Sequence, residues 1–364
     1  MTIYGHRHCH HASNDLKPSL DNAPSVPTNI AHSRLNNFLA GAGQFYSMGI
    51  HNRLWILRHS GAPHVQLKVY SVPDVKEAIT QKFQEFIIGQ HDFGPSWTTH
   101  WFQVTVKIPE ALDGHEVTLQ WDMGCEGLVW SHDGVPLQGL TGGSDQARHE
   151  FIISKKAKAN EVYLLYIEAA CNGMFGVGAS DSMVADPNRY FKLTQADLVV
   201  ANKPVQDLYH DLTILRGIAF DTDSNSIQAR KALWVANEVI NYFIGDDETA
   251  ISECNRLTRK FLNEQNGSEM HRVTAVGNCH IDTAWLWPYD ETKRKVARSW
   301  SSQLNLIERY PDYVFTASQV QQYEWLQELY PKLFEKIKAA EKNEQWEIIG
   351  GSWVEHGKSL QYLY

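Results

Sequence analysis

The sequence lacks several features that would assign it to a common class. It has no apolar run long enough to cross a membrane and no charged-then-apolar signal at its start, so neither a membrane span nor classical secretion is indicated. It has no basic stripe, and its net charge of −9 argues against nucleic acid as a partner. We therefore expect a cytoplasmic protein, although later delivery to a vacuole or lysosome is invisible in these features.

Cysteine is also scarce. The five cysteines are odd in number and widely scattered, which is typical of free thiols in a reducing compartment rather than of a disulfide framework. With 364 residues and 43% hydrophobic content, the chain is long enough for two or three domains with real cores.

The first part of the chain carries little structural signal. Residues 1–32 contain a His/Cys tract, His6–His11, followed by a polar segment, and we interpret this region as a disordered tail rather than a metal site. Residues 33–95 have a mixed pattern. They are predicted to form an N-terminal arm packed on later domains.

Residues 96–200 change to a period of two. Phe102, Val104 and Val106 alternate with polar residues, and Asp113-Gly114 and Asp133-Gly134 fall between apolar runs, as type I′ hairpin turns require. Several short strands at this spacing predict a jelly-roll-like β-sandwich. Its tryptophans, Trp97, Trp101 and Trp130, are compatible with a sugar-binding face, but core and interface packing is the stronger expectation.

A helical period follows over residues 201–268. Apolar stripes at Leu208 to Ala219 and at Leu233 to Phe243, with a third helix from Glu248 to Leu262, predict a helical connector.

Strands and helices then alternate over residues 269–364. The pattern predicts strands at Arg272–Cys279, Tyr313–Ala317 and Trp346–Ile349. Between them it predicts a helix at Asp290–Arg309 and one or two helices, broken at Pro331, over Gln319–Ala340. This alternation is typical of a parallel α/β sheet or barrel, so the expected fold class is a multidomain α+β protein.

Two polar side chains follow the first predicted strand of this region. If the chain remains extended, His280 and Asp282 point to the same side, and an imidazole with a carboxylate suits zinc or another divalent transition metal. The alternative is a His–Asp hydrogen bond that closes the strand end.

Aromatic residues stand beside this pair. Trp285 and Trp287, followed by Pro288, offer a wide surface on which the C–H face of a pyranose stacks well. Core packing is the alternative, and we expect it for Trp287 or Leu286.

The run from His280 to Gln303 resembles the opening motif of family 38 α-mannosidases, especially their cytosolic and fungal vacuolar branch. The resemblance implies a metal-dependent, retaining glycoside hydrolase that acts on terminal α-mannosyl residues of free or glycoprotein-derived oligosaccharides. It implies zinc (Zn2+), with cobalt (Co2+) as an alternative, bound by His280 and Asp282, and a sugar packed on Trp285. It further implies a non-catalytic β domain, a seven-stranded (β/α) barrel and a homo-oligomer.

The end of the sequence departs from that family. The segment from Gly350 to His356 is similar to the next family motif, but residues 357–364 do not continue it, and the nucleophilic Asp expected by resemblance lies beyond Tyr364. We therefore expect residues 269–364 to be an incomplete N-terminal part of the catalytic domain that binds zinc weakly, hydrolyses nothing alone and tends to aggregate. Glu355 and His356 either face the site or cap a strand end.

Two other functions remain open from the sequence. One is a non-catalytic carbohydrate-binding or regulatory fragment that relies on the β-sandwich. The other is a different metal hydrolase built on the His-x-Asp pair, which leaves the tryptophans unexplained.

Overall fold

Two units are assembled from segments that alternate along the chain. The computed structural model describes residues 27–72, 75–142, 148–176, 186–245, 247–264 and 273–355. The helical unit combines Met1–Leu54 with Asn202–Ser268, and the mixed unit combines Trp55–Ala201 with Glu269–Tyr364. Most of the predicted tail lies outside the described residues, including its His/Cys tract and Cys9, but the prediction is wrong at its end, because the chain is helical from Thr28 and Ala31 is buried.

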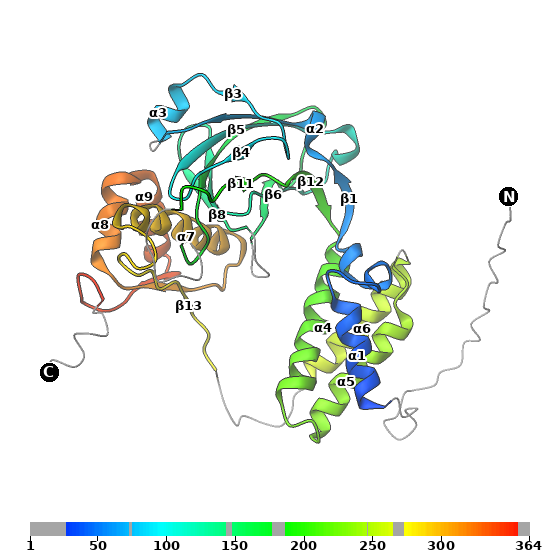
Figure 1. Cartoon of the computed structure of the whole chain (residues 1–364). Helices are drawn as coiled ribbons and strands as arrows, with labels where there is room; N and C mark the ends of the chain where they lie inside the picture. The colour runs from blue at the N-terminus through cyan, green and yellow to red at the C-terminus, as the bar shows by residue number, and fades with distance from the viewer. Residues whose placement is uncertain are drawn as a thin grey trace, which may run out of the picture. The chain divides into compact units, whose positions relative to one another are not determined.

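The helical unit packs the predicted connector helices with a helix from the start of the chain (Figure 1). The described helices are α1 (Thr28–Leu39), α4 (Lys203–Asp221), α5 (Ile227–Tyr242) and α6 (Glu248–Asn263), with short 3-10 turns η2 (Tyr46–Met48) and η3 (His51–Arg53). Two starts are capped: Ser226 accepts from the Ala229 amide, and Asp247 accepts from the Thr249 and Ala250 amides. The predicted helices are thus confirmed.

The mixed unit contains a two-sheet antiparallel sandwich. One sheet has the order β1-β12-β6-β9 and the other β3-β2-β5-β10-β7-β8, and every pairing within them is antiparallel. The first sheet contains β1 (Trp55–His59), β12 (Gln195–Ala201), β6 (Val117–Asp122) and β9 (Glu150–Ser154). The second contains β3 (Gln84–Glu85), β2 (Val65–Tyr70), β5 (Thr99–Lys107), β10 (Val162–Ala170), β7 (Glu126–Ser131) and β8 (Pro136–Leu140).

Small elements complete the sandwich. They are α2 (Gly61–His64), α3 (Val75–Thr80), η4 (Glu110–Leu112) and the paired strands β4 (Asp92–Phe93) and β11 (Phe191–Lys192). The predicted period of two is confirmed, because Phe102, Val104 and Val106 are all fully buried in the core between the sheets.

Two details differ from the prediction. The segment expected to be an arm supplies β1 and β2, and β2 pairs with β5 over six residues, so the sandwich begins near Trp55 rather than at residue 96. Apolar residues do alternate in β2, at Val65, Leu67 and Val69, but the alternation extends over few residues. The turns at Gly114 and Gly134 are not type I′, because only the glycine of each Asp-Gly pair has positive φ.

The last part of the chain forms a small parallel sheet with flanking helices. Strands β13 (Gly277–Asn278), β14 (Phe315–Ala317) and β15 (Trp346–Ile348) alternate with α7 (Tyr289–Arg309), α8 (Val320–Leu329) and α9 (Pro331–Lys342). The predicted alternation is confirmed. The first strand is shorter than predicted, because β13 pairs with β14 at only two positions, Gly277 and Asn278. Val273 lies before that pairing and is 87% exposed.

A second core joins this α/β segment to the outer face of the six-stranded sheet. Trp101 and Trp130 are buried there in one cluster with Trp300 of α7, which confirms the packing role expected for them. Helix α7 lies directly on β8: a Cβ at Gly139 would stand 2.6 Å from the Arg298 carbonyl oxygen. The sandwich therefore forms the platform on which the first helix of the α/β segment rests.

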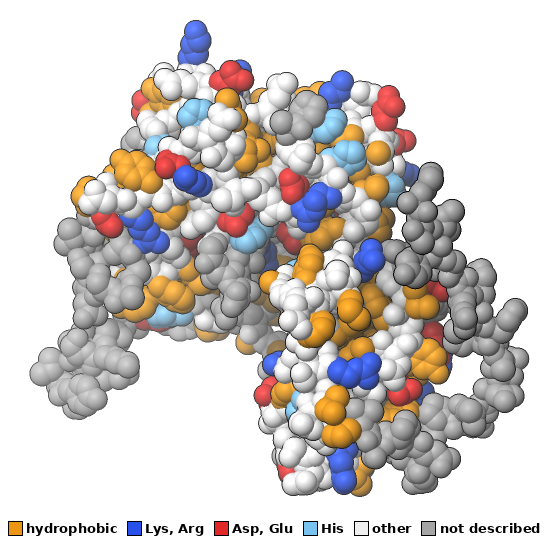
Figure 2. Space-filling view, turned by 45° about the vertical axis from the view of Figure 1, so that its right-hand side comes forward, with side chains coloured by type: hydrophobic (Ala, Val, Ile, Leu, Met, Phe, Trp, Pro, Cys, Tyr) orange, Lys and Arg blue, Asp and Glu red, His pale blue; other side chains and the backbone are white. Residues whose placement is uncertain are grey.

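The surface shows no simple guide to a site. On the face in Figure 2, Lys and Arg side chains are interspersed with Asp, Glu and hydrophobic ones over the described residues. In the same described ranges, no helix has the length and apolar character needed to cross a membrane. The distribution of surface charge therefore does not mark a functional site.

Candidate functional site

The predicted polar pair lies where three parallel strands end. His280 and Asp282 follow β13, Ser318 follows β14 at once, and Glu355 lies seven residues past the end of β15. Because parallel strands present their carboxyl ends at one edge, chain segments that are distant in sequence meet there. This edge brings together an imidazole, two carboxylates and a hydroxyl.

The imidazole of His280 lies between the two carboxylates. Its Nε2 is 3.2 Å from an Asp282 oxygen, and its Nδ1 is 2.7 Å from an oxygen of Glu355. The Ser318 hydroxyl donates to the other oxygen of Glu355. The side chains of His280, Asp282 and Glu355 are 40–52% exposed, so the cluster is open to solvent.

This geometry suits half of a metal site. With Nδ1–H donating to Glu355, the lone pair of Nε2 lies beside an Asp282 oxygen, and metal-bound histidines usually donate their second N–H to a carboxylate in this way. Within the described ranges, no three His, Cys, Asp or Glu side chains are arranged to hold a metal ion. The donor types fit zinc, but His280 and Asp282 would be two candidate donors rather than a complete set.

The segment that follows displays one tryptophan and buries the other. Trp285 is 47% exposed, whereas Trp287 is 5% exposed and meets it edge to face at 5.5 Å. Thr292 on α7 fixes this turn, because its hydroxyl oxygen accepts from the Ala284 amide and from the Trp287 indole. The core packing expected for Trp287 is confirmed, and Trp285 is left available to a ligand.

Glutamines from the second βα connection hold the backbone of the site. Gln319 and Gln322 each donate to the Ile281 carbonyl at 2.8 Å, and the Thr283 hydroxyl donates to Gln319 at 3.0 Å. The residue between His280 and Asp282 is therefore tied to the neighbouring strand end, which fixes the spacing of the pair.

A buried charge cluster lies beneath this segment, between α7 and the sandwich. Its carboxylates and cations are Glu126, Glu168, Glu291, Arg294, Lys295 and Arg298. Arg298 pairs with Glu291 and with Glu126, and Lys295 also pairs with Glu126. Ion pairs this deep lose their hydration, so each buried charge needs a partner close by. The positions of these partners therefore specify how α7 packs on the sandwich.

The two most deeply buried glutamates of the cluster have opposite pKa shifts. Burial opposes the charge of Glu291, but Arg298 and Arg294 outweigh it, and the pKa of that carboxyl is lowered. Burial raises the pKa of Glu168, and Arg294 and Arg298 offset this only in part. The charge of Glu168 is thus the least favourable one in the cluster, although the Trp130 indole donates to this carboxylate at 3.2 Å.

Lys295 connects the cluster to the tryptophan segment. Its ammonium group lies 4.7 Å from the ring centre of Trp287 and donates to the Met174 carbonyl at 2.9 Å. One buried side chain therefore contacts the sandwich, α7 and the segment that displays Trp285.

The sequence predicted part of this arrangement. His280 and Asp282 lie together as expected, and Trp285 is exposed three residues further along the chain, while their roles in metal and sugar binding stay predictions. Glu355 was left open between facing the site and capping a strand end, and the structure places it on His280. His356 lies outside the described residues. Ser318 and Gln319 gave no signal, because their positions depend on which strands are neighbours.

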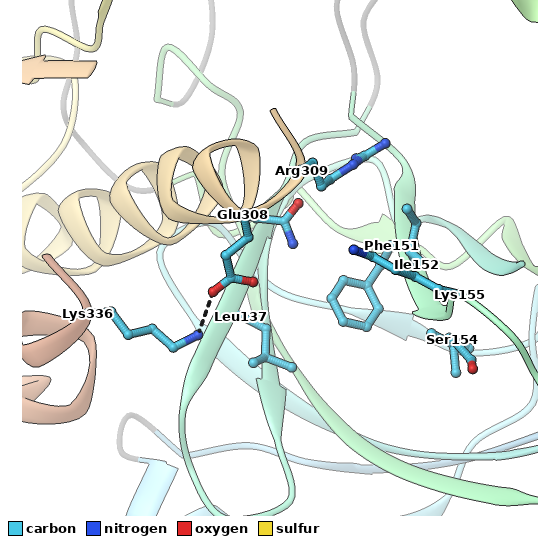
Figure 3. Close-up of a pocket in the computed structure, with 10 residues that line it drawn as sticks. Leu137, Phe151, Ile152, Ser154, Lys155, Glu308, Arg309 and Lys336 are labelled. Carbon is cyan, nitrogen blue, oxygen red and sulfur yellow. Dashed lines mark hydrogen bonds and ion pairs between the residues drawn. The ribbon is translucent and has the colours of Figure 1, made fainter. Parts of the chain in front are cut away.

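A cavity elsewhere in the mixed unit does not coincide with this site. It has a volume of about 280 Å³ and is lined from β8, β9, α7 and α9, with Lys336 paired to Glu308 at 3.3 Å (Figure 3). Its α7 residues belong to the last turns of that helix, roughly 30 Å along the axis from the first turn beside Trp285. We do not assign the predicted chemistry to it.

Comparison with family models gives two matches. Residues 62–199 match the α-mannosidase jelly roll domain, and residues 270–363 match the N-terminal domain of family 38 glycosyl hydrolases. Together these matches cover more than half of the chain. The second one contains every residue of the strand-end cluster.

Individual proteins are similar to most of the chain. It is 38% identical over 349 residues to α-mannosidase G of Dictyostelium discoideum, which is 92% of this chain and 32% of that protein. It is 39% identical over 286 residues to human α-mannosidase 2C1, which is 78% of this chain and 27% of that protein. The chain thus spans about a third or less of these relatives. A β-glucuronidase structure from Ruminococcus gnavus covers 40% of this chain and 29% of its own at 10% identity and a TM-score of 0.30, a likeness too low to carry an argument.

Proposed function

We propose, on the premise that this chain belongs to the family 38 α-mannosidases, that its strand-end cluster is the metal and sugar half of an α-mannosidase site. The substrate class is terminal α-mannosyl residues of free or glycoprotein-derived oligosaccharides. The observation that carries the proposal is the position of the His280–Asp282 pair, at the carboxyl ends of parallel strands and a few residues before an exposed tryptophan.

The metal in this proposal is zinc, with cobalt as an alternative. His280 Nε2 and the Asp282 carboxylate would hold it, while Glu355 accepts from Nδ1 and fixes the neutral tautomer that leaves Nε2 free. When bound, such an ion supplies a positive centre that the sugar hydroxyls coordinate, which orients the ring. The role of Ser318 is to orient Glu355.

The sugar in this proposal stacks on Trp285. Its indole is half exposed, and its edge-to-face contact with the buried Trp287 limits its rotation. A pyranose presents an apolar C–H face that such a ring accepts. On this proposal, one sugar meets both the ring of Trp285 and the metal held by His280 and Asp282.

Hydrolysis needs more than this half. A retaining mechanism uses two carboxyl groups about 5–5.5 Å apart, one as nucleophile and one as acid and base. Both Asp282 and Glu355, the described carboxylates at the strand ends, are engaged by His280. We therefore expect the residues described here to bind α-mannosides without cleaving them.

The thiols support a reducing compartment such as the cytoplasm. Cys125, Cys171, Cys254 and Cys279 are all unpaired in the described structure, and three of them are buried. Proteins of oxidising compartments more often carry disulfides.

The test compares the chain with His280→Ala and Asp282→Ala versions, using His132→Ala as an exposed histidine control. Thermal unfolding is measured with and without zinc or cobalt, and hydrolysis of an aryl α-mannoside is measured alongside. We expect metal to raise the melting temperature of the chain and of the control, and to leave both site variants unchanged, with no hydrolysis by any of them. Equal metal stabilisation in all four proteins would overturn the metal assignment, and hydrolysis that needs His280 and Asp282 would overturn the expected inactivity.

A further inference from the structure

A short turn of the sandwich exposes two large apolar side chains beside the candidate site. In the segment 173–176, Gly173 and Gly176 exchange backbone hydrogen bonds of 2.9 and 3.0 Å, which places Met174 and Phe175 at the tip. Phe175 is 63% exposed and Met174 is 36% exposed. Neighbouring apolar side chains that a tight, internally bonded turn holds in the solvent are the kind of surface that a ligand or partner covers.

The turn is fixed from three directions. The buried ammonium group of Lys295 donates to the Met174 carbonyl at 2.9 Å, and Arg189 donates to the Gly176 carbonyl at 3.3 Å. Gly176 also lies close to the segment that displays Trp285, because a Cβ at Gly176 would overlap the Leu286 carbonyl oxygen. The tip is thus held at a fixed position relative to the segment that displays Trp285, as a binding surface requires.

Phe175 meets Trp285 at a right angle. Their ring centres are 6.3 Å apart and their planes are inclined by 83°. One ring comes from the sandwich and the other from the α/β segment, and both are about half exposed or more. Two fixed rings at a right angle present two neighbouring apolar surfaces to solvent.

We propose that Phe175 contacts the sugar unit next to the one that stacks on Trp285, so that the sandwich helps to select α-mannosyl disaccharides and longer chains over a single mannose. This inference rests on the proposed function, because it takes Trp285 as the stacking platform. The ligand class is an α-linked mannobiose unit. Met174 forms the apolar flank of the same contact.

The experiment measures binding of two probes to the whole chain in the presence of zinc: methyl α-mannoside and α-1,2-mannobiose. Isothermal titration is applied to the unsubstituted chain and to Phe175→Ala, Phe175→Tyr and Trp285→Ala. Tyr310→Ala serves as the control, because this 53% exposed aromatic follows the opposite end of α7. Urea midpoints of all variants establish that they remain folded.

We expect the unsubstituted chain to prefer mannobiose. Phe175→Ala should weaken mannobiose binding about fivefold, the value of one lost aromatic contact, and leave methyl α-mannoside unchanged. Phe175→Tyr should keep the preference, and Trp285→Ala should weaken both probes. A purely structural role for Phe175 predicts a lower urea midpoint with no change in the ratio of the two affinities.

The outcomes separate the two levels of the proposal. If Trp285→Ala loses both probes while Phe175→Ala keeps the preference for mannobiose, the inference about Phe175 is wrong and the sugar platform stands. If Tyr310→Ala reproduces the effect of Phe175→Ala, the contact is also refuted. If the unsubstituted chain binds neither probe, or Trp285→Ala binds both normally, the proposed function fails and this inference fails with it.

Discussion

Two glutamates in the buried charge cluster should respond in opposite ways to the same substitution. Glu168 and Glu291 are each 2% exposed, and both lie between α7 and the six-stranded sheet. In each, Gln keeps the shape and removes only the charge. Glu291 has its pKa lowered by Arg298 and Arg294 against the effect of burial, whereas burial dominates at Glu168 and its pKa is raised.

The expected magnitudes follow from these contacts. Glu291→Gln removes one of the two carboxylates paired with Arg298 and leaves Glu126 as the other, so it should cost about 1.5–3 kcal/mol of unfolding free energy at pH 7. Glu168→Gln removes a charge that burial disfavours, and the Gln oxygen still accepts from Trp130, so it should leave the unfolding free energy unchanged or raise it.

The pH dependence has the opposite sign at the two positions. The folded-state pKa of Glu291 is lowered, so its contribution is complete above the unfolded value of about 4.3 and is lost as the pH falls below it. The folded-state pKa of Glu168 is raised, so ionisation above about pH 4.3 costs stability, and protonation in acid relieves the cost. Both variants should therefore approach the unsubstituted chain in acid.

Urea unfolding followed by tryptophan fluorescence measures these effects. Of the twelve tryptophans, all except Trp234 lie in the mixed unit, so the signal reports on that unit. Glu308→Gln on the same helix is the control: its pair with Lys336 is 60% exposed on the Glu308 side, so the change should stay within about 1 kcal/mol. A Glu168→Gln variant as unstable as Glu291→Gln would refute the reasoning.

Two further predictions concern the metal pair and the packing of α7 on the sandwich. Glu355→Ala should weaken zinc binding about 10- to 100-fold, because the Nδ1 of His280 loses its acceptor at 2.7 Å. Competition with a zinc chelator measures this, Glu347→Ala on β15 is the exposed control, and equal affinities would remove Glu355 from the metal assignment. Gly139→Ala should lower the stability of the mixed unit by about 1–3 kcal/mol, since the new Cβ would overlap the Arg298 carbonyl oxygen at 2.6 Å. Gly351→Ala, with nothing within 4 Å, should leave the urea midpoint unchanged, and identical midpoints for both variants would contradict the close contact.

The extent of the sandwich was harder to predict than its core. The alternation from Phe102 to Lys107 identified β5, since buried and less buried residues follow one another there with a period of two. Strand β1 gave no usable signal: it is five residues long and its alternate positions are only half buried. Its place depends on β12, more than a hundred residues later, which supplies its hydrogen-bond partners.

Local periodicity and chemistry were therefore enough to determine the helices, the main strands and the identity of His280, Asp282 and Trp285 as a candidate site. Those features depend on residues within a few positions of one another. Only the tertiary structure decided that Glu355 lies on His280, that α7 rests on a buried charge cluster and that Phe175 stands beside Trp285. Each of these joins segments far apart in the chain, and such contacts depend on strand order and packing, which no local pattern encodes.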